Sequence, residues 1–148
     1  MGSLSPCNAS QINKEWAYGG NPSTEQYLEK ALDLFPSAAI FDCTGRPVSY
    51  ILYEPEGCMA MGYTDPAFRG RGFFSVVNYL LATHLFRLGL KQTYVQVLHS
   101  NSSSKRVYLK LGAEIASGWH QHWILYRPNN ISQDSPELVS LPGVDPEA

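Results

Sequence analysis

Apolar residues recur at helical spacing in two long stretches of the chain, and these stretches predict two helices. The first begins after Asn21, a residue type that caps helix N-termini, and ends at Pro36, which cannot continue a helix. The second covers residues 73–88, where the apolar positions form one broad face, and Gly89 follows as a C-terminal cap. A third, shorter helix is predicted after Asn101, which can also cap.

Short runs rich in β-branched, aromatic and other apolar residues predict the strands. They cover residues 38–41, 48–53, 59–64, 93–98, 114–117 and 121–127. Short turns join the first three runs, so we expect three antiparallel strands in sequence, with the long helix following the third. Residues 1–14 are polar and predict a loose segment, and residues 128–148, rich in proline, asparagine and serine, predict a disordered tail. We therefore expect one folded α/β domain over residues 15–127.

Composition narrows the function classes. The chain has 148 residues and a net charge of −2, so no broad basic surface for nucleic acid or membrane is predicted. No run is long enough for a transmembrane helix, and no secretory signal is visible. The three cysteines, Cys7, Cys43 and Cys58, fit neither a disulfide framework nor a zinc motif. We therefore expect an intracellular protein, mitochondrial or cytoplasmic, that binds neither nucleic acid nor membrane.

The turn between the third predicted strand and the long helix carries candidate binding residues. Gly70 and Gly72 lack a Cβ, so backbone N–H groups there can approach a ligand closely. The helix that follows leaves its first amides unpaired, and its dipole favours negative charge at that end. Arg69 and Arg71 add positive charge. The stretch therefore predicts a phosphate site, the alternative being an ordinary turn with two solvated arginines.

The spacing of these residues distinguishes between kinds of phosphate ligand. No P-loop run is present, and the dinucleotide fingerprint G-x-G-x-x-G fails because Ser75 stands at its third glycine. Arg69-x-x-Gly72 followed by a helix resembles the pyrophosphate-binding turn of the GNAT acyl-CoA N-acyltransferases, whose pattern is Q/R-x-x-G-x-G/A. The chain departs from that pattern at the last position, which is Phe74.

A second stretch carries the same resemblance. Asn101-x-x-Ser104-x-x-x-Tyr108-x-Lys110-x-Gly112 is similar to the second GNAT motif, usually N-x-x-A-x-x-x-Y-x-K-x-G-F. Two motifs in the right order are more specific than either alone. The resemblance implies an α+β fold with a mixed, mostly antiparallel sheet, flanked by helices and splayed between its fourth and fifth strands to admit acyl-CoA or acetyl-CoA. The implied CoA-binding residues are Tyr63, Thr64, Arg69, Gly70, Arg71, Gly72, Phe73, Phe74, Ser75, Asn101, Ser104 and Tyr108.

Further segments narrow the resemblance to one branch of the family. They are similar to segments in the C-terminal domain of glycine N-acyltransferases and their paralogues: Trp16-x-Tyr18-Gly19, Phe35-Pro36-Ser37, Met61-Gly62-Tyr63-Thr64 and Gly118-Trp119-His120-Gln121. The resemblance covers roughly residues 12–127 and implies transfer of an acyl group from a CoA thioester to glycine or another small amine. Members of that branch are longer, so the chain would be their C-terminal catalytic half or a shortened homologue, acting as a monomer or weak dimer.

The implied reaction needs a neutral amine, a stabilised oxyanion and a proton for the departing thiolate. By family analogy Tyr108 supplies that proton, its alternative role being packing against the sheet. A backbone amide of the strand over residues 59–64 would meet the oxyanion. The general base of the branch is a glutamate, and Cys58 stands at its place, which we interpret as a buried structural cysteine. Glu56 lies two residues earlier and could act as base only if the turn is rearranged.

Two other functions remain open on the sequence. One is N-acetylation of a peptide or protein amine, which an open acceptor groove lined by acidic residues would favour. The other is a non-catalytic acyl-CoA-binding module, suggested by Cys58 at the base position. His120 and His122 alternate on one predicted strand face, but no carboxylate or cysteine partner is apparent nearby, so no metal site is predicted.

Overall fold

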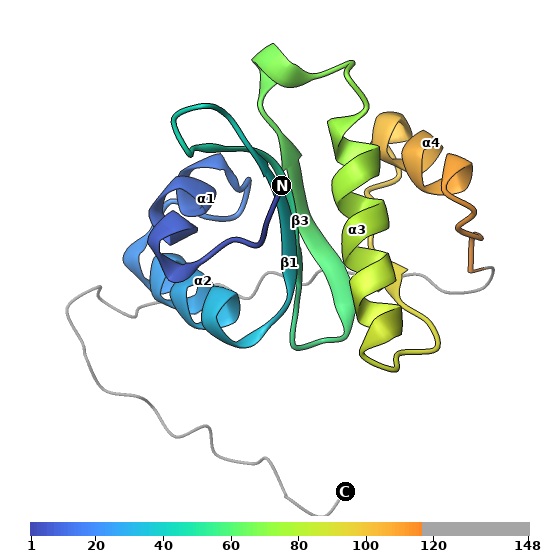
Figure 1. Ribbon diagram of the computed structural model, residues 1–148, viewed down its shortest axis with the longest axis horizontal. Helices are drawn as coiled ribbons and strands as arrows, with labels where there is room; N and C mark the ends of the chain where they lie inside the picture. Colours follow the sequence, from blue (N-terminus) through green and yellow to red (C-terminus); the bar gives the residue numbers. More distant parts are fainter. Residues whose placement is uncertain (117–148) are drawn as a thin grey trace, which may run out of the picture. The chain divides into compact units, whose positions relative to one another are not determined.

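The computed structural model describes residues 1–116 (Figure 1). The α-helices are α1 (Ala9–Glu15), α2 (Pro22–Leu34), α3 (Phe73–Arg87) and α4 (Ser102–Lys110), and the 3₁₀ helices are η1 (Pro6–Asn8) and η2 (Pro66–Phe68). The strands are β1 (Ser37–Phe41), β2 (Pro47–Tyr53), β3 (Cys58–Thr64) and β4 (Tyr94–Val95). The three predicted helices and the first three predicted strands are confirmed, with small shifts at their ends. Within these residues no helix is both long and apolar enough to cross a membrane.

The strands form one sheet in the order β1-β2-β3-β4. The first two pairs are antiparallel, whereas β3 and β4 are parallel. β4 pairs with β3 only through Tyr94 with Cys58 and Val95 with Met59. Residues 96–98, which the pattern assigned to the same strand, form no strand and do not pair with β3. The sheet is therefore mixed and mostly antiparallel, and it splays after Val95.

The splay predicted between the fourth and fifth strands of the family fold falls between β3 and β4 here. The strand numbers differ by one because the first strand of the family fold is absent from the described residues. At that edge of the sheet, beside β1, a single β-bridge takes its place. The amide of Gly2 donates to the carbonyl of Ala39 at 3.0 Å, and the amide of Ala39 donates to the carbonyl of Gly2 at 2.7 Å. The basic glycine turn still follows the strand that borders the splay, as the resemblance implied.

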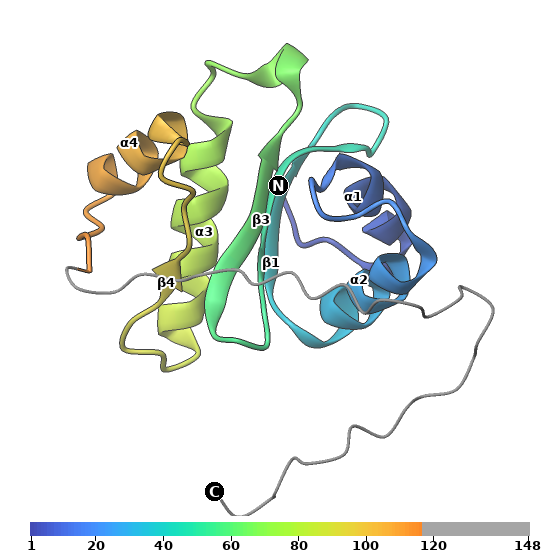
Figure 2. The same ribbon diagram turned by 180° about the vertical axis from the view of Figure 1, so that it is seen from behind.

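Helices cover both faces of the sheet (Figures 1 and 2). α1 and α2 lie on one face, and α3 packs against the other, with α4 beside α3. The buried side chains on the α1–α2 face are Leu4, Ala9, Ile12, Leu28, Leu32, Ala39, Tyr50 and Leu52. Those on the α3 face are Ala38, Ile51, Met59, Val77, Leu81 and Leu85. Alternation along the strands produces this division, since Tyr50 and Ile51 are neighbours in β2 and face opposite helix layers.

Residues 1–14 are folded, so the prediction of a loose N-terminal segment is wrong. Leu4 is 5% exposed, and Ala9 and Ile12 of α1 are 1% and 0% exposed in the core they share with α2 and β2. These few apolar side chains stand among polar ones, and the run of helically spaced apolar positions is too short to be recognised as an amphipathic helix. Tertiary burial, which no local pattern reports, holds the segment in place.

Several predictions fall at or beyond the end of the described chain. Residues 114–116, the described part of the predicted strand 114–117, form no strand. The predicted strand over residues 121–127, the predicted tail over 128–148 and the end of the predicted domain lie outside the described residues. The same holds for His120 and His122 and for the segment Gly118-Trp119-His120-Gln121.

Candidate functional site

A cavity of about 300 Å³, here called the sheet cavity, occupies the splay. Its walls come from α1 and the loop after it, from β2 and β3, from residues 96–98, from the start of α3 and from α4. Among the lining residues, Tyr50 belongs to the core on the α1–α2 face, and Met59 belongs to the core on the α3 face. The cavity therefore has walls from both faces of the sheet. The predicted residues that line it are Tyr63, Phe74, Asn101, Ser104 and Tyr108.

A second cavity of about 390 Å³, here called the turn cavity, lies at the glycine turn. The predicted residues that line it are Thr64, Arg69, Gly70, Gly72, Phe73, Phe74 and Ser75. Phe68, Val107 and Lys110 complete the described lining. Phe74 lines both cavities, so the two adjoin at that side chain. All the predicted CoA-binding residues except Arg71 thus line one of two adjoining cavities.

The glycine turn adopts a left-handed backbone conformation. Gly70 and Gly72 each have a φ of 77°, which strains any residue that carries a Cβ. A Cβ added at either position would meet no atom within 4 Å. Glycine is therefore needed here for the backbone conformation, and the space beside the turn is open. Gly72 is also the N-cap residue of α3, and no side chain caps that helix, so its first amides are available to an anion.

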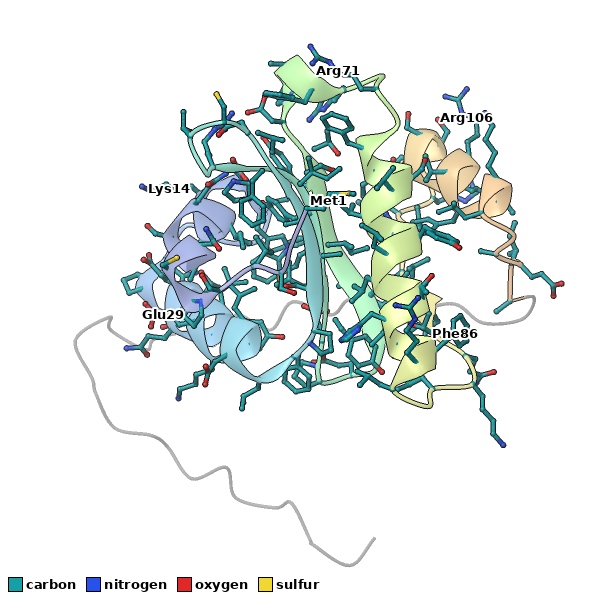
Figure 3. The ribbon with its side chains drawn as sticks, in the orientation of Figure 1. Met1, Lys14, Glu29, Arg71, Phe86 and Arg106 are labelled. Carbon is teal, nitrogen blue, oxygen red and sulfur yellow. The ribbon has the colours of Figure 1, made fainter. Side chains whose placement is uncertain are left out.

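The two arginines of the turn are placed differently. Arg69 lines the turn cavity, and its Nε donates to the carbonyl of Thr64 at 3.0 Å. The guanidinium of Arg71 lies 5.2 Å from the centre of the Phe68 ring, and its Nη2 donates to the carbonyl of Ala67 at 3.3 Å. Figure 3 shows Arg71 at the outer end of the turn. Arg69 is therefore the arginine placed to contact a ligand in the turn cavity.

Phe74 stands where the family pattern has a small residue, and Gly62 of β3 makes room for it. A Cβ at Gly62 would lie 2.6 Å from Cε2 of Phe74. The Phe74 ring also meets the Tyr108 ring edge-on, with 5.9 Å between the ring centres. The large Phe74 side chain at the start of α3 is thus accommodated because Gly62 in β3 has no side chain. The departure from the GNAT pattern at Phe74 therefore does not disturb the turn.

Gly62→Ala should lower the free energy of unfolding by about 1–3 kcal/mol, because the added methyl group would overpack against Phe74. Gly2→Ala is the control, since its Cβ would meet only Phe41, at an ordinary 3.6 Å. Urea unfolding measures both variants. In a Phe74→Leu background the cost of Gly62→Ala should shrink; an equal cost in both backgrounds would contradict this contact as the cause.

β3 bulges at the wall of the sheet cavity. The register between β2 and β3 shifts between Tyr50 and Leu52, so that Met61 and Gly62 together stand opposite a single residue of β2. Met61 has a φ of 52°, the only positive value at a non-glycine residue in the described chain. Both bulge residues line the sheet cavity. Because a bulge interrupts the hydrogen bonds between strands, it leaves backbone groups available at the cavity wall.

α4 carries three predicted residues into the sheet cavity. Asn101 caps the helix, with its Oδ1 accepting from the amide of Ser104 at 3.1 Å. Ser104 and Tyr108 lie one helical turn apart and so share a face. Burial raises the pKa of Tyr108 above its usual value of 10.0, because the phenolate would lose its hydration. The Tyr108 phenol is therefore protonated at neutral pH and able to act as a proton donor.

Cys58 and Glu56, the other candidate catalytic residues, line neither cavity. Cys58 is 3% exposed, and its thiol donates to Oε2 of Glu54 at 3.6 Å. Burial, and after it the Glu54 carboxylate, raise the pKa of this thiol to about 11, which agrees with a structural cysteine. Glu56 is exposed, and its carbonyl accepts the hydroxyl of Tyr94 at 2.7 Å. A catalytic role for Cys58 or Glu56 stays a prediction.

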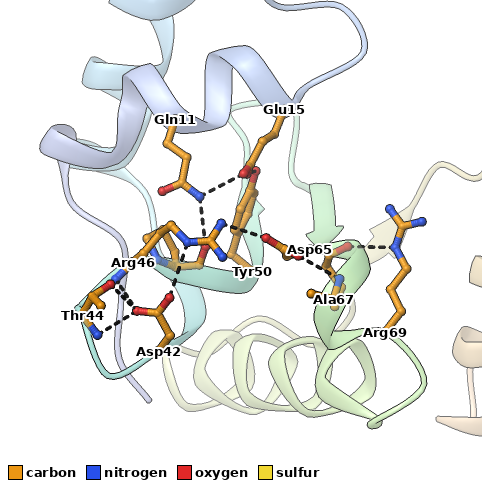
Figure 4. Close-up of polar contacts among 11 residues, drawn as sticks. Gln11, Glu15, Asp42, Thr44, Arg46, Tyr50, Asp65, Ala67 and Arg69 are labelled. Atoms are coloured by element: carbon orange, nitrogen blue, oxygen red, sulfur yellow. Dashed lines mark hydrogen bonds and ion pairs between the residues drawn. The ribbon is translucent and has the colours of Figure 1, made fainter.

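Lys110, Glu15 and Tyr50 line these cavities but were not among the predicted site residues. Lys110 of α4 lines the turn cavity and had a sequence signal, since it belongs to the second motif. Glu15 of α1 and Tyr50 of β2 line the sheet cavity, and the Tyr50 hydroxyl donates to Oε2 of Glu15 at 2.7 Å (Figure 4). Neither Glu15 nor Tyr50 belongs to a sequence motif that marks a site. Glu15 ends a segment in which no helical spacing of apolar residues is recognisable, and Tyr50 is typical of an ordinary strand residue.

The chain matches a known family and is similar to longer relatives. Residues 38–127 match the family model described as aralkyl acyl-CoA:amino acid N-acyltransferase, C-terminal region. Glycine N-phenylacetyltransferase of Bos taurus is 28% identical over 126 residues, which are 82% of this chain and 41% of the relative. Glycine N-acyltransferase of Homo sapiens is 30% identical over 122 residues, with the same two shares. The chain therefore spans less than half the length of these relatives.

Solved structures share the fold. A protein of Drosophila superposes with a TM-score of 0.67 at 18% identity, over 74% of this chain and 37% of that one. A GCN5-related N-acetyltransferase of Ralstonia eutropha superposes with a TM-score of 0.58 at 13% identity, over 81% of this chain and 95% of that one. These likenesses show the GNAT fold. Since the family model covers more than half of the sequence, the chain belongs to the aralkyl acyl-CoA:amino acid N-acyltransferase family, through its C-terminal region.

Proposed function

We propose that the protein is an acyl-CoA-dependent N-acyltransferase, which moves an acyl group from a CoA thioester to glycine or another small amine. Family membership supports the reaction class. The observation that carries the proposal is the pair of adjoining cavities that share Phe74. The turn cavity, with its helix amides and cations, suits the phosphates of CoA. The sheet cavity, with a protonated Tyr108 in its wall, suits the thioester.

Each part of the reaction has a residue suited to it. Arg69 and Lys110 supply positive charge around the pyrophosphate, and the amides at the start of α3 donate to it. Backbone donors of the bulge at Met61 and Gly62 stabilise the oxyanion that forms on the carbonyl. As the C–N bond forms and the C–S bond breaks, Tyr108 gives its proton to the thiolate.

An aromatic acyl group fits the sheet cavity best. Its lining includes the aromatic rings of Trp16, Tyr18, Tyr50, Tyr63 and Phe74. Rings of this kind bind another ring through edge-to-face and offset contacts. A relative that carries the name glycine N-phenylacetyltransferase supports the same choice. We infer an intracellular location, mitochondrial or cytoplasmic, from the free thiols of Cys7, Cys43 and Cys58.

A non-catalytic acyl-CoA-binding module is the second candidate. It is favoured by the buried, neutral Cys58 and by the position of Glu56 outside both cavities. Measuring the release of CoA thiol distinguishes the enzyme from the binding module. The donors are acetyl-CoA, benzoyl-CoA and phenylacetyl-CoA, and the acceptor is glycine or benzylamine. An enzyme releases thiol only when an amine is present and forms the matching amide, seen by mass spectrometry. Calorimetric binding of CoA without release would favour the module, and no binding would contradict both.

Arg69→Gln should weaken CoA binding about tenfold at low salt, whereas Arg71→Gln should weaken it less than about threefold. The reason is that Arg69 lines the turn cavity and Arg71 lies against Phe68 outside it. Both effects should shrink as salt rises, since exposed charges are screened beyond about 8–10 Å at physiological ionic strength. Calorimetric titration at several salt concentrations measures them. Two equal losses that do not change with salt would contradict the assignment.

A further inference from the structure

We propose that Glu15 is the acceptor-side residue of the acyl transfer, whose carboxylate binds the ammonium group of the acceptor and takes a proton from its nitrogen. The inference rests on the proposed function and names a residue of the cavity wall as the proton acceptor, whereas the sequence candidates Cys58 and Glu56 line neither cavity. It is carried by the position of Glu15, by the hydrogen bonds that hold its carboxylate, and by the charge around it.

The Glu15 carboxylate is held at the wall of the sheet cavity. Glu15 is the last residue of α1 and is partly buried. Its Oε2 accepts the Tyr50 hydroxyl at 2.7 Å, and its Oε1 accepts Nε2 of Gln11 at 3.0 Å (Figure 4). Both donors are themselves fixed, because Tyr50 is 1% exposed and Gln11 also donates to the carbonyl of Pro47 at 3.0 Å. The carboxylate is thus oriented before any acceptor arrives.

The charge of this carboxylate is not balanced within the described chain. Its two donors, Gln11 and Tyr50, are neutral, and it forms no ion pair with a described residue. The described lining of the sheet cavity includes no lysine, arginine or histidine. Burial, and after it the Glu15 charge, raise the pKa of Tyr63, whose ring lies 5.5 Å from that of Tyr50 in the cavity wall, so the Glu15 charge acts on a neighbouring lining residue. A partly buried anion without a cationic partner attracts an ammonium ion.

The cavity places Glu15 opposite the thioester. On one side it is lined by Tyr108 and by Phe74, which adjoins the turn cavity where CoA binds. Those two side chains pack on the α3 face of the sheet. Glu15 and its partner Tyr50 belong to the α1–α2 face. The amine therefore approaches the carbonyl from the α1 side, while the sulfur leaves toward Tyr108.

The proton balance assigns Glu15 a defined step. The bound ammonium gives one proton to the Glu15 carboxylate, which leaves a neutral amine with a lone pair. The lone pair attacks the carbonyl carbon, the C–N bond forms, and the C–S bond breaks. Tyr108 protonates the thiolate, and the second nitrogen proton returns through water to the Tyr108 phenolate. Glu15 then releases its proton to solvent, so one proton is released for each ammonium consumed.

This step predicts a particular pH dependence. A carboxylate with an ammonium carries the same number of protons as a carboxylic acid with a free amine. The wild-type rate per total amine should therefore be nearly flat from about pH 6 to the amine pKa, which is near 10 for alkylamines. Glu15→Gln depends on the small fraction of neutral amine, so its rate should rise about tenfold per pH unit over the same range.

Rates of phenylacetyl-CoA consumption with glycine or benzylamine, measured from about pH 6 to 9, test the proposal. Glu15→Gln should lower kcat/KM about 10–100-fold at neutral pH, with the loss shrinking as pH rises. Glu29→Gln is the matched control, because it removes an exposed carboxylate of α2 outside both cavities and should change neither rate nor slope. Thermal unfolding and calorimetric CoA affinity of Glu15→Gln should stay near wild type, because the amide oxygen of the substituted side chain can accept from Gln11 while its amide nitrogen donates to the Tyr50 hydroxyl oxygen.

The outcomes distinguish a failure of the Glu15 proposal from a failure of the proposed acyltransferase function. Transfer by wild type with a flat profile, and a steep profile in the variant, supports Glu15 as the acceptor-side residue. A variant with the same rate and the same flat profile as wild type would overturn it while leaving the acyltransferase function standing. An equal loss at every pH would also overturn it and would assign Glu15 a structural role in holding Tyr50. A wild-type protein that binds CoA but transfers nothing would overturn the proposed function and this inference together.

Discussion

Gly72→Asp should raise the dissociation constant for CoA about 100-fold or more. The substitution puts a carboxylate at the N-cap of α3, beside the amides that we propose to bind pyrophosphate. Losing charge-assisted hydrogen bonds costs about 1.5–3 kcal/mol, and repulsion between the carboxylate and the phosphates adds to that cost. Because about 1.4 kcal/mol corresponds to a tenfold change in affinity, the loss should be large enough for calorimetry to detect plainly.

Gly72→Asn is the matched control for this experiment. Asparagine has nearly the same shape as aspartate and meets the same strain at a φ of 77°, but it adds no charge. Both variants should lose similar unfolding free energy, and the asparagine variant should keep more CoA affinity than the aspartate variant. If both lost affinity equally, backbone strain alone would explain the result. Unchanged affinity in the aspartate variant would contradict a phosphate site at this turn.

The turn and α4 were predictable because their requirements are local. Gly70 and Gly72 adopt the left-handed conformation directly before α3 begins, so a few adjacent residues are enough to specify this turn and helix start. Asn101, Ser104 and Tyr108 likewise share one helix, so the motif spacing fixes the face that carries them. The turns that join β1, β2 and β3 are short enough to give the antiparallel order. The splay after Val95 was predicted by the family resemblance and not by the strand pattern, which continued through residues 96–98.

The acceptor side was not predictable because it depends on contacts distant in sequence. Glu15 acquires its position from Tyr50, which lies 35 residues further along the chain. The helix that carries Glu15 is held by Ile12 in a core made with α2 and β2, and its own sequence is mostly polar. Gly62 has a comparable relation to Phe74, since a glycine in a strand gives no sign of which ring it accommodates. Such pairs are visible only once the sheet is assembled.

Tyr108→Phe should lower the rate of acyl transfer by about 10²–10⁴-fold, because it removes the proposed proton donor to the thiolate. A thiolate is already a good leaving group, which argues for the smaller end of this range. The ring should keep its edge-on contact with Phe74. Unfolding free energy and CoA affinity should therefore barely change. Single-turnover measurements are the suitable assay, since product release could hide a loss in the chemical step.

The high pKa of Tyr108 sharpens this test. Burial keeps the phenol protonated beyond its usual 10.0, so activity carried by Tyr108 should not fall as pH rises toward that value. The Phe variant lacks the donor at every pH, and its deficit should stay constant over the neutral and mildly alkaline range. Equal single-turnover rates for the two proteins would remove Tyr108 from the mechanism and leave it a packing role against Phe74. No transfer by either protein, despite tight CoA binding, would favour the acyl-CoA-binding module, because losing a proton donor cannot slow a reaction that the wild type does not perform.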